Sequence, residues 1–320
     1  MKKIALMTSG GDAPGMNACI RSVVRTSIAK SIKVYGINRG YEGLINDDIY
    51  ELTSAQVSNI IQRGGTILKS ARSKSFMTVE GQVDAVNILN KRNIDGLIVI
   101  GGDGSLTGAN ILYKKYGIKV VGIPCSIDND IYGTDNAIGV DTALNRIISA
   151  IDIINDTASS HDRTFIIEVM GRNCGYLALM SSIAGGAEYA LIPEKDTNIE
   201  EIIDMVKLRY REGKSRSILI VAEGAGSAAS IAKIFTEKGY IDTRITILGH
   251  LQRGGSPTYF DRMLSTAMGI KAVEGLIDGE YGKMVALRGS MLYYIPLEEA
   301  IGKKKELEMG LLDINKMLNV

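Results

Sequence analysis

The sequence predicts an α/β protein built from two Rossmann-like, doubly wound domains with mainly parallel sheets. Short apolar runs typical of strands alternate along the chain with segments of helical periodicity. The clearest case is the run 94–100, the helical segment 105–116 and the run 118–123, which form the strand–helix–strand unit of a parallel sheet. The 320 residues exceed the roughly 250–300 at which one hydrophobic core stops growing, so we expect two domains.

The other elements follow the same alternation. We predict strands over residues 3–8, 33–37, 163–170, 217–222 and 243–248. We predict helices over residues 17–30, 142–156, 199–211, 228–238 and 262–275. No linker rich in Gly, Ser or Pro divides the chain, so we expect domains joined by several crossings, with the active site in the cleft between them.

Composition excludes several classes of protein. Apolar residues make up 45% and charged residues 23%, which is typical of a folded globular chain. The 37 Lys and Arg against 36 Asp and Glu give a net charge of +1, so nothing indicates nucleic acid or an anionic membrane. Three cysteines without CxxC spacing argue against a disulfide framework or a zinc site. With no apolar stretch of about 18 residues, we expect a cytoplasmic protein.

Two acidic loops are the most informative feature of the sequence. Residues 101–105 and 126–130 each follow a predicted strand of the same βαβ unit. Ligands of open α/β sheets bind at the carboxyl ends of the strands, so Asp103 and Asp128 could flank one ligand. An acid in a glycine-rich loop beside a second acid suits magnesium-assisted phosphoryl transfer. The alternative for Asp103 is an ordinary N-cap of the following helix.

Two further glycine-rich turns invite comparison with nucleotide motifs. Residues 9–17 join the first strand to the first helix and could bind an anion. They match neither a Walker A loop nor G-x-G-x-x-G. The alternative is an ordinary turn between strand and helix. Residues 224–229 satisfy G-x-G-x-x-A, with Asp242 downstream. Asp242 precedes its strand, whereas the ribose-binding acid of a dinucleotide site follows one. We therefore disfavour a nicotinamide site.

Several motifs in the same order resemble the bacterial-type ATP-dependent 6-phosphofructokinase family over nearly the whole chain. They lie at residues 4–12, 63–66, 101–105, 126–130, 133–135, 168–172 and 249–257. The resemblance implies an ATP site, with Asp103 holding Mg²⁺. The residues implied for ATP are Gly11, Arg72, Ser73, Gly102, Asp103, Gly104 and Ser105.

The resemblance also implies a catalytic set and a sugar site. Asp128 would take the proton of the sugar 1-hydroxyl beside Ser126 and Asp130, and Arg172 would stabilise charge on the transferring group. Substrate contacts would come from Ser126, Asp128, Arg163, Met170, Gly171, Arg172, Glu223, Arg244, His250 and Arg253, with Arg163 and Arg244 supplied by a neighbouring subunit. Taken singly, these arginines could be surface residues and His250 a structural histidine.

The sequence departs from the family pattern beside the second acidic loop. Pyrophosphate-dependent relatives carry Asp and Lys at two positions where this chain has Gly104 and Cys125. Gly104 leaves room for a nucleotide, and Cys125 brings no positive charge. ATP is therefore the expected donor, although Cys125 is bulkier than the usual glycine.

The implied regulatory site departs further. Arg21 and Arg25, four residues apart on one helix, match an effector site together with Glu188 and Lys214. Basic residues common in that site are replaced by Asn155 and Glu212, and Ser54 brings no charge. We expect weak or altered regulation by nucleotides and phosphoenolpyruvate. A solvated helix face is the alternative for the two arginines.

The expected protein is a homotetrameric kinase that converts fructose 6-phosphate and MgATP to fructose 1,6-bisphosphate and ADP. Residues 1–138 and 251–302 would form the ATP-binding domain, and residues 139–250 and 303–320 the fructose 6-phosphate-binding domain. The alternatives are a pyrophosphate-dependent enzyme, an NAD or lipid kinase, and a non-catalytic sensor of sugar phosphates or nucleotides on the same fold.

Overall fold

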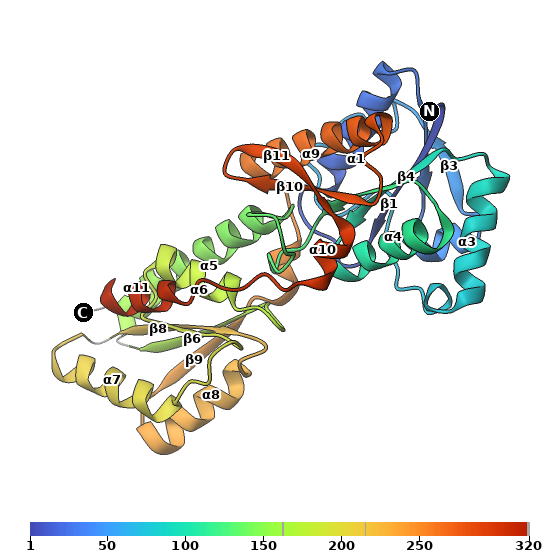
Figure 1. Cartoon of the computed structure of the whole chain (residues 1–320). Helices are drawn as coiled ribbons and strands as arrows, with labels where there is room; N and C mark the ends of the chain where they lie inside the picture. Colours follow the sequence, from blue (N-terminus) through green and yellow to red (C-terminus); the bar gives the residue numbers. More distant parts are fainter. Residues whose placement is uncertain (162, 215, 319–320) are drawn as a thin grey trace. The chain divides into compact units, whose positions relative to one another are not determined.

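The chain crosses repeatedly between two units, and the computed structural model describes residues 1–161, 163–214 and 216–318 of it (Figure 1). Unit 1 comprises Met1–Ile127, Ile131–Asp141 and Arg253–Lys305. Unit 2 comprises Asp128–Asp130, Thr142–Gln252 and Glu306–Val320. The structure thus groups Asp128–Asp130 with the second unit, whereas the sequence-based boundaries had placed them in the first domain.

Unit 1 contains, within the described residues, a seven-stranded sheet of order β11-β10-β5-β4-β1-β2-β3. Its inner strands are parallel, and β3 and β11 run antiparallel at the two edges. Every residue of β4 and β5 is buried, as expected for parallel strands covered on both faces. The strands are β1 Lys3–Ser9, β2 Lys33–Ile37, β3 Ile49–Leu52, β4 Gly96–Gly101, β5 Val120–Pro124, β10 Lys283–Arg288 and β11 Met291–Pro296.

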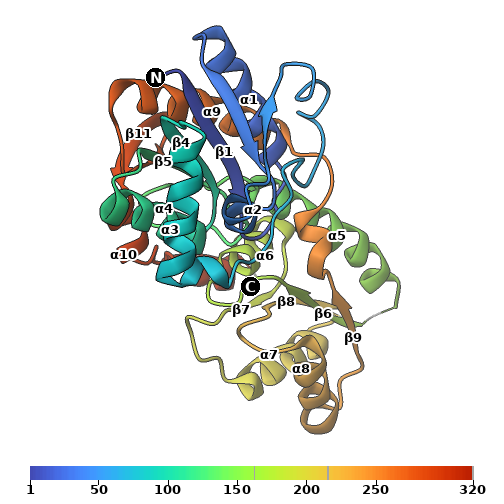
Figure 2. The same cartoon turned by 90° about the vertical axis from the view of Figure 1, so that its right-hand side faces the viewer.

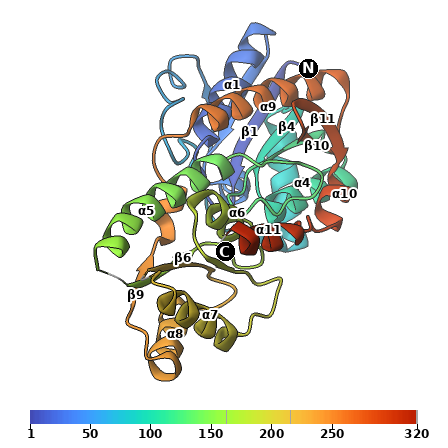
Figure 3. The same cartoon turned by 90° about the vertical axis from the view of Figure 1, so that its left-hand side faces the viewer.

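The helices of unit 1 include a pair formed by segments far apart in the sequence. Helix α1 lies beside helix α9, as Figures 1 and 3 show, and Ser22 Oγ donates a hydrogen bond to the carbonyl of Thr266 at 2.6 Å. Gly269 permits this close approach, because a Cβ there would lie 2.9 Å from Ser22 Oγ. The helices are α1 Met16–Ala29, α2 Gly40–Ile45, α3 Val79–Lys91, α4 Asp103–Tyr116, α9 Tyr259–Asp278 and α10 Leu297–Gly302, with a short 3-10 turn at Ser75–Met77.

Unit 2 contains, in its described part, a four-stranded parallel sheet of order β7-β8-β6-β9. The strands are β6 Thr164–Val169, β7 Tyr189–Leu191, β8 Ser217–Ala222 and β9 Thr243–Ile247. The helices are α5 Val140–His161, α6 Tyr176–Gly185, α7 Ile199–Arg211, α8 Ala228–Ile234 and α11 Gly310–Leu318, with a 3-10 turn at Gly249–Arg253. Helices α7 and α8 pack on one face of the sheet (Figures 1 and 2), and α6 and α11 lie on the other (Figures 1 and 3).

The predicted α/β class and the predicted βαβ unit are confirmed. Strands β4 and β5 pair in parallel and are joined by α4. The helix predicted over 228–238 changes to a π turn at Phe235–Gly239, which closes on a left-handed Tyr240. The helix predicted over 262–275 extends to Tyr259–Asp278, because Thr258 caps it by accepting a hydrogen bond from the Asp261 N–H. None of the described helices is long and apolar enough to cross a membrane.

Candidate active site

Three loops of unit 1 leave the carboxyl ends of neighbouring parallel strands. The ends of β1 and β4 meet at Ser9 and Gly101, and the ends of β4 and β5 meet at Gly101 and Pro124. The loops that follow are residues 10–15 after β1, Gly102 after β4, and Cys125 and Ser126 after β5. The sheet therefore brings together the glycine-rich loop and the start of both acidic loops; of these, the closeness of the two acidic loops was predicted from the βαβ unit.

Contacts to the backbone hold the loop after β4. The Tyr41 hydroxyl donates a hydrogen bond to the Ser105 carbonyl at 2.6 Å, and the Tyr41 ring stacks on Phe76 with centroids 4.0 Å apart. Burial raises the pKa of Tyr41, so this hydroxyl stays a donor at all working pH values. A Cβ on Gly10 would lie 3.2 Å from Ser105 Oγ, which packs the first loop against the start of α4.

The segment predicted to bind ATP with these loops begins at Arg72. The exposed Arg72 precedes Ser73, whose Oγ accepts a hydrogen bond from the Phe76 N–H at 3.2 Å. Because Phe76 stacks on Tyr41, the segment is fastened to the residue that holds Ser105. The sequence analysis predicts no role for Tyr41 or Phe76, because two residues so far apart in the chain give no local signal of stacking.

Asp103 is the first residue of α4, and the helix is capped by Gly102 without a side-chain hydrogen bond. The alternative in which Asp103 acts as the N-cap is therefore wrong. Its exposed carboxylate stands among the unsatisfied N–H groups of a helix start, and a Cβ on neighbouring Gly104 would meet nothing within 4 Å. One exposed carboxylate with open space beside it fits Mg²⁺, which takes one or two carboxylates and completes its shell with phosphate and water.

Arg253 lies in unit 1, against the glycine-rich loop after β1. Its Nη1 donates a hydrogen bond to the Asp12 carbonyl at 3.1 Å, and a Cβ on Gly11 would lie 2.6 Å from the same atom. The guanidinium thus occupies the space that the missing side chain of Gly11 leaves. Gly64 is close to the next part of that segment, since a Cβ on Gly64 would lie 2.4 Å from the Gly255 carbonyl.

Cys125 turns its side chain into the core of unit 1. The residue is buried, and Sγ lies 3.5 Å from the Ile138 carbonyl, to which it donates a hydrogen bond. Burial, followed by the charges around it, raises the pKa of the Cys125 thiol well above its usual value. The core of unit 1 therefore accommodates the side chain of Cys125, which is larger than the glycine usual at this position beside the second acidic loop.

Three strands of unit 2 deliver the residues predicted for the sugar. Strands β8, β6 and β9 are neighbours with parallel registers, so their carboxyl ends lie side by side. Arg172 follows β6, Glu223 follows β8 and His250 follows β9, and all three side chains are exposed. The structure therefore brings together in unit 2 a cation, an acid and an imidazole from three separate motifs.

Backbone contacts fix the spacing of these turns. The Glu223 N–H donates to the Val169 carbonyl at 2.9 Å, and a Cβ on Gly224 would lie only 2.0 Å from the Arg172 carbonyl. Gly224 is thus needed for the turn after β8 to approach the Met170–Arg172 turn. This role, rather than a dinucleotide, accounts for the first glycine of the G-x-G-x-x-A pattern.

Gln252 joins the turn after β6 to the turn after β9. It is fully buried, its Oε1 accepts a hydrogen bond from the Met170 N–H at 3.1 Å, and its Nε2 donates to the Gly249 carbonyl at 3.0 Å. Gln252 lies within the motif at residues 249–257, but the sequence predicts no role for it, because an internal hydrogen bond has no sequence signal.

The second acidic loop alternates between buried and half-buried side chains. Ile127 and Asn129 are buried, whereas Ser126, Asp128 and Asp130 are half-buried. Asn129 has a left-handed backbone with φ of 52°, which asparagine tolerates better than other side-chain-bearing residues. The three polar side chains therefore alternate with the residues that anchor the loop.

Asp128 and Asp130 of unit 2 lie near the turn after β6. Burial raises the pKa of Cys174 to about 11, and the carboxylates of Glu194, Asp130 and Asp128 add to this shift. The carboxylates of Asp128 and Asp130 thus interact electrostatically with Cys174, which follows Arg172 by two positions. The acid predicted as base and the arginine predicted for charge stabilisation belong to adjoining segments.

Asp242 holds two arginines at the start of the edge strand β9. Arg163 Nε lies 3.3 Å from Asp242 Oδ2, and Arg244 Nη1 lies 2.6 Å from Asp242 Oδ1. The sheet aligns them, because Thr164 pairs with Thr243 and Phe165 with Arg244. The acid of the G-x-G-x-x-A pattern is therefore engaged in ion pairs.

The residues predicted for an effector are divided between the units. In unit 1, burial and the nearby charge of Arg25 lower the pKa of Arg21, so the two cations are close on α1. In unit 2, Glu188 is buried, 2.8 Å from Arg209 Nη2, and accepts a hydrogen bond from the Ile218 N–H.

The positions where the sequence departs from the effector pattern also lie on known elements. Lys214 Nζ lies 3.9 Å from Glu212 Oε2, so the acid that replaces a basic residue pairs with the predicted lysine. Asn155 is half-buried on α5, and Ser54 is exposed after β3.

Two α/β units with acidic and glycine-rich loops at the ends of parallel strands define the class of phosphate-handling α/β enzymes. Residues 3–276 match the family model described as phosphofructokinase. The ATP-dependent 6-phosphofructokinases of Thermotoga neapolitana and Clostridioides difficile are 50% and 49% identical to this chain, each match covering 100% of both sequences. The chain belongs to the phosphofructokinase family, which confirms the resemblance and the predicted phosphotransferase.

Solved structures agree with this membership. The structure of phosphofructokinase from Pichia pastoris in the T-state matches with a TM-score of 0.89 and 40% sequence identity. The match covers 94% of this chain and 35% of that one. This chain therefore spans about a third of that relative. A pyrophosphate-dependent phosphofructokinase from Marinobacter aquaeolei also gives 0.89, at 22% identity, over 99% of this chain and 88% of its own. At that identity the likeness concerns the fold alone.

Proposed function

We propose that this chain transfers the γ-phosphoryl group of MgATP to the 1-hydroxyl of D-fructose 6-phosphate, giving fructose 1,6-bisphosphate and ADP. One observation carries the proposal: each unit gathers half of the required chemistry at the ends of three neighbouring parallel strands. Unit 1 offers glycine-rich loops, a helix start and an exposed acid, which suit a triphosphate with its cation. Unit 2 offers Arg172, Glu223 and His250, which suit a phosphorylated sugar.

ATP would bind to unit 1, which becomes the ATP-binding domain. Backbone N–H groups at the start of α4 would contact phosphate oxygens, and Gly104 leaves the space that a nucleotide needs. Asp103 would hold Mg²⁺, which when bound neutralises and orients the phosphates. The binding residues proposed are Gly11, Arg72, Ser73, Gly102, Asp103, Gly104 and Ser105.

Asp128 would act as the general base. An ionised aspartate carboxylate can accept the proton of the sugar hydroxyl. A base contributes about 10²–10⁴-fold, so the rest of the acceleration falls to positioning and charge. Arg172 would stabilise the charge on the transferring phosphoryl group, with Ser126 and Asp130 beside the base.

Fructose 6-phosphate would bind to unit 2. Glu223 would accept hydrogen bonds from sugar hydroxyls, and the Met170–Arg172 turn would pack on the ring. His250 and Arg253 would bind the 6-phosphate, each charge-assisted hydrogen bond contributing about 1.5–3 kcal/mol. The Asp12 contact holds the Arg253 guanidinium in place for this role.

We also propose that the chain forms a homotetramer in which Arg163 and Arg244 complete a neighbour's sugar site. Strand β9 supports this, because it is an edge strand whose Ile245 and Ile247 side chains are 44% and 58% exposed. Asp242 pre-orients both arginines on the same edge. The proposed compartment is the cytoplasm, where the three buried free cysteines stay reduced.

The proposal also includes an effector site. Arg21, Arg25, Glu188 and Lys214 would contact a nucleotide or phosphoenolpyruvate. Because Glu188 already pairs with Arg209, and Lys214 with Glu212, we expect weak regulation. Steady-state kinetics with phosphoenolpyruvate at a fixed concentration of fructose 6-phosphate measure the degree of inhibition. Strong inhibition would contradict the expectation of weak regulation.

The donor is tested by one coupled assay with fructose 6-phosphate that offers ATP and pyrophosphate separately. We expect turnover with ATP only, as the names of the relatives suggest. Turnover with pyrophosphate alone would support the pyrophosphate-dependent alternative, and none with either donor would support the sensor.

The base is tested by Asp128→Asn. We expect kcat to fall by about 10²–10⁴-fold while KM for ATP changes little. Asp152→Asn, the same change at an exposed position of α5, is the matched control and should leave kcat unchanged. Retained kcat in Asp128→Asn would remove Asp128 from this role.

A further inference from the structure

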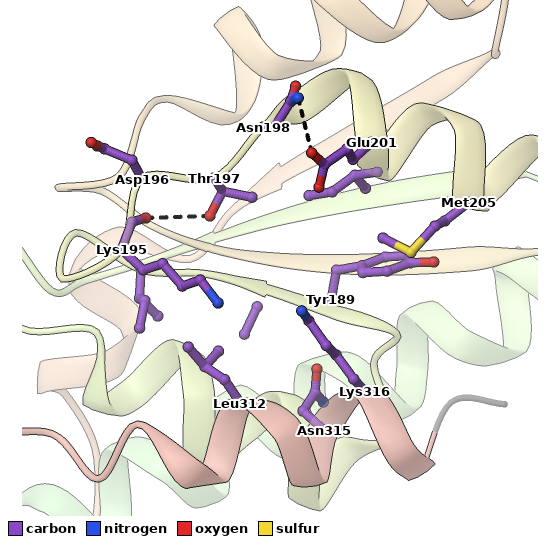
Figure 4. A pocket seen from close by; sticks show the side chains of 13 residues that line it. Tyr189, Lys195, Asp196, Thr197, Asn198, Glu201, Met205, Leu312, Asn315 and Lys316 are labelled. Carbon is purple, nitrogen blue, oxygen red and sulfur yellow. Dashed lines mark hydrogen bonds between the residues drawn. The ribbon is translucent and has the colours of Figure 1, made fainter.

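Unit 2 contains a pocket that the proposed reaction does not use. It has a volume of about 150 Å³ and lies between the end of β7, the start of α7 and α11 (Figure 4). Its lining includes Tyr189, Lys195, Met205, Leu312 and Lys316. None of these residues belongs to the loops at the ends of β6, β8 and β9.

The wall formed by α11 is held firmly. The buried Asn315 donates hydrogen bonds from Nδ2 to Ser182 Oγ at 2.9 Å and to the Ala187 carbonyl at 3.2 Å. Leu312, one turn earlier, is 7% exposed. These contacts fix the helix that carries Lys316, so the pocket does not depend on a loose C-terminal segment.

Two ammonium groups enter the pocket from opposite walls. Figure 4 shows Lys195, from the segment after β7, and Lys316, from α11, with their Nζ atoms pointing toward each other. Among the described carboxylates, none forms an ion pair with either lysine. Two like charges that face each other repel, and an anion between them relieves the repulsion.

The two acids of the lining, Asp196 and Glu201, form no ion pair with Lys195 or Lys316 within the described residues. Asp196 points away from the centre of the pocket in Figure 4. Glu201 Oε1 accepts a hydrogen bond from Asn198 Nδ2 at 3.2 Å, at the start of α7. The lining therefore contains two ammonium groups and two carboxylates, and the ammonium groups are the ones that point toward each other.

The remaining lining includes an apolar wall as well as the polar Thr197, Asn198 and Asn315. Tyr189 and Met205 lie together on one side in Figure 4, with Leu312 opposite. A dry cavity of about 150 Å³ can hold one benzene molecule, and an aromatic ring packs well on tyrosine and on a methionine sulfur.

We propose that this pocket binds a small aromatic acid, its single ring on Tyr189 and Met205 and its carboxylate between Lys195 and Lys316. The two lysines supply charge-assisted hydrogen bonds to the carboxylate, and the apolar wall selects a ring-sized body. The site is separate from the proposed phosphoryl transfer, so it stands or falls independently of it.

Benzoate is the probe, and the full chain labelled at the methionine methyl groups is the sample. We expect a saturable NMR shift of the Met205 methyl, assigned through Met205→Leu, with Kd of about 1 mM as suits nine non-hydrogen atoms. Benzyl alcohol has the same size without the charge and should bind at least about fivefold more weakly. The methyl of Met291, in unit 1, should not move.

Lys195→Gln and Lys316→Gln should each raise the Kd of benzoate by about threefold to tenfold, the range for a solvent-exposed charge contact. Lys233→Gln removes the same charge from an exposed position of α8 and should leave the Kd unchanged. Three results would each overturn the proposal. The first is the absence of a saturable shift at benzoate concentrations up to about 20 times the expected Kd. The others are equal affinity for benzoate and benzyl alcohol, and an effect of Lys233→Gln equal to that of the two pocket variants.

Discussion

Gln252 offers the sharpest test of how the sugar site of unit 2 is positioned. The change is Gln252→Leu, which keeps a side chain of similar size and removes both hydrogen bonds of a fully buried amide. The Met170 N–H and the Gly249 carbonyl are then left without that partner. Each unsatisfied buried group costs about 1–3 kcal/mol, and these two are only part-buried, so the free energy of unfolding should fall by about 2–4 kcal/mol, the lower part of the range for two groups.

The same change should weaken binding of the sugar phosphate. Met170 and Gly249 begin the turns that carry Arg172 and His250, so both turns relax when Gln252 no longer joins them. We expect KM for fructose 6-phosphate to rise about tenfold, equivalent to about 1.4 kcal/mol, and KM for ATP to change less than about twofold. Steady-state kinetics with each substrate varied in turn, together with urea unfolding, measure both effects.

Gln82→Leu separates positioning from general destabilisation. Gln82 is also buried, and it donates to the Phe76 carbonyl at 3.3 Å and accepts from the Tyr116 hydroxyl at 3.2 Å, all in unit 1. It should lower stability comparably and leave KM for fructose 6-phosphate unchanged. An unchanged KM for the sugar in Gln252→Leu, or an effect confined to ATP, would refute the positioning role.

Three other outcomes follow from buried groups. Glu188→Gln should lower the free energy of unfolding by about 2–4 kcal/mol in thermal denaturation, because Arg209 loses its buried charged partner. The Cys174 thiol titrates near 9.0 when unfolded and at about 11 when folded, so its contribution is complete below pH 9 and disappears as the pH rises to 11. Urea unfolding from pH 9 to pH 11 measures the decline in the free energy of unfolding. This decline should be about 2–3 kcal/mol smaller in Cys174→Ala than in the unsubstituted protein. Cys125→Gly should leave KM for ATP within about twofold, because Sγ faces the Ile138 carbonyl; a large fall in that KM would show that the sulfur obstructs the nucleotide.

Local patterns in the sequence predicted the loops after β4 and β5 correctly. Buried parallel strands give uninterrupted apolar runs, and the glycine and aspartate residues that end them are visible without a structure. The pairing of these two strands also followed from their closeness in the chain. Both acidic loops could therefore be placed at strand ends from the sequence.

Contacts between distant segments could not be predicted in this way. Nothing near Arg253 indicates that its guanidinium fills the space beside Gly11, because that contact depends on how 241 intervening residues fold back. Likewise, no periodicity shows that β10 pairs with β5. Asp242 was read only as a possible ribose ligand, since its ion pairs with Arg163 and Arg244 arise from the pairing of β6 with β9.

The late position of α9 and β10 in the sequence has a consequence for synthesis of the chain on the ribosome. Roughly 160 residues separate Pro124 from Lys283, so at about 5–20 residues per second the edge of β5 waits about 8–30 s for β10. The surface of α1 waits longer for α9, because more residues separate these two helices. During that time unit 2 is translated in full up to Gln252, while unit 1 remains an open sheet. The nascent protein therefore finishes most of its second unit before the first can close, and the apolar surface that α9 later covers is where a chaperone would bind.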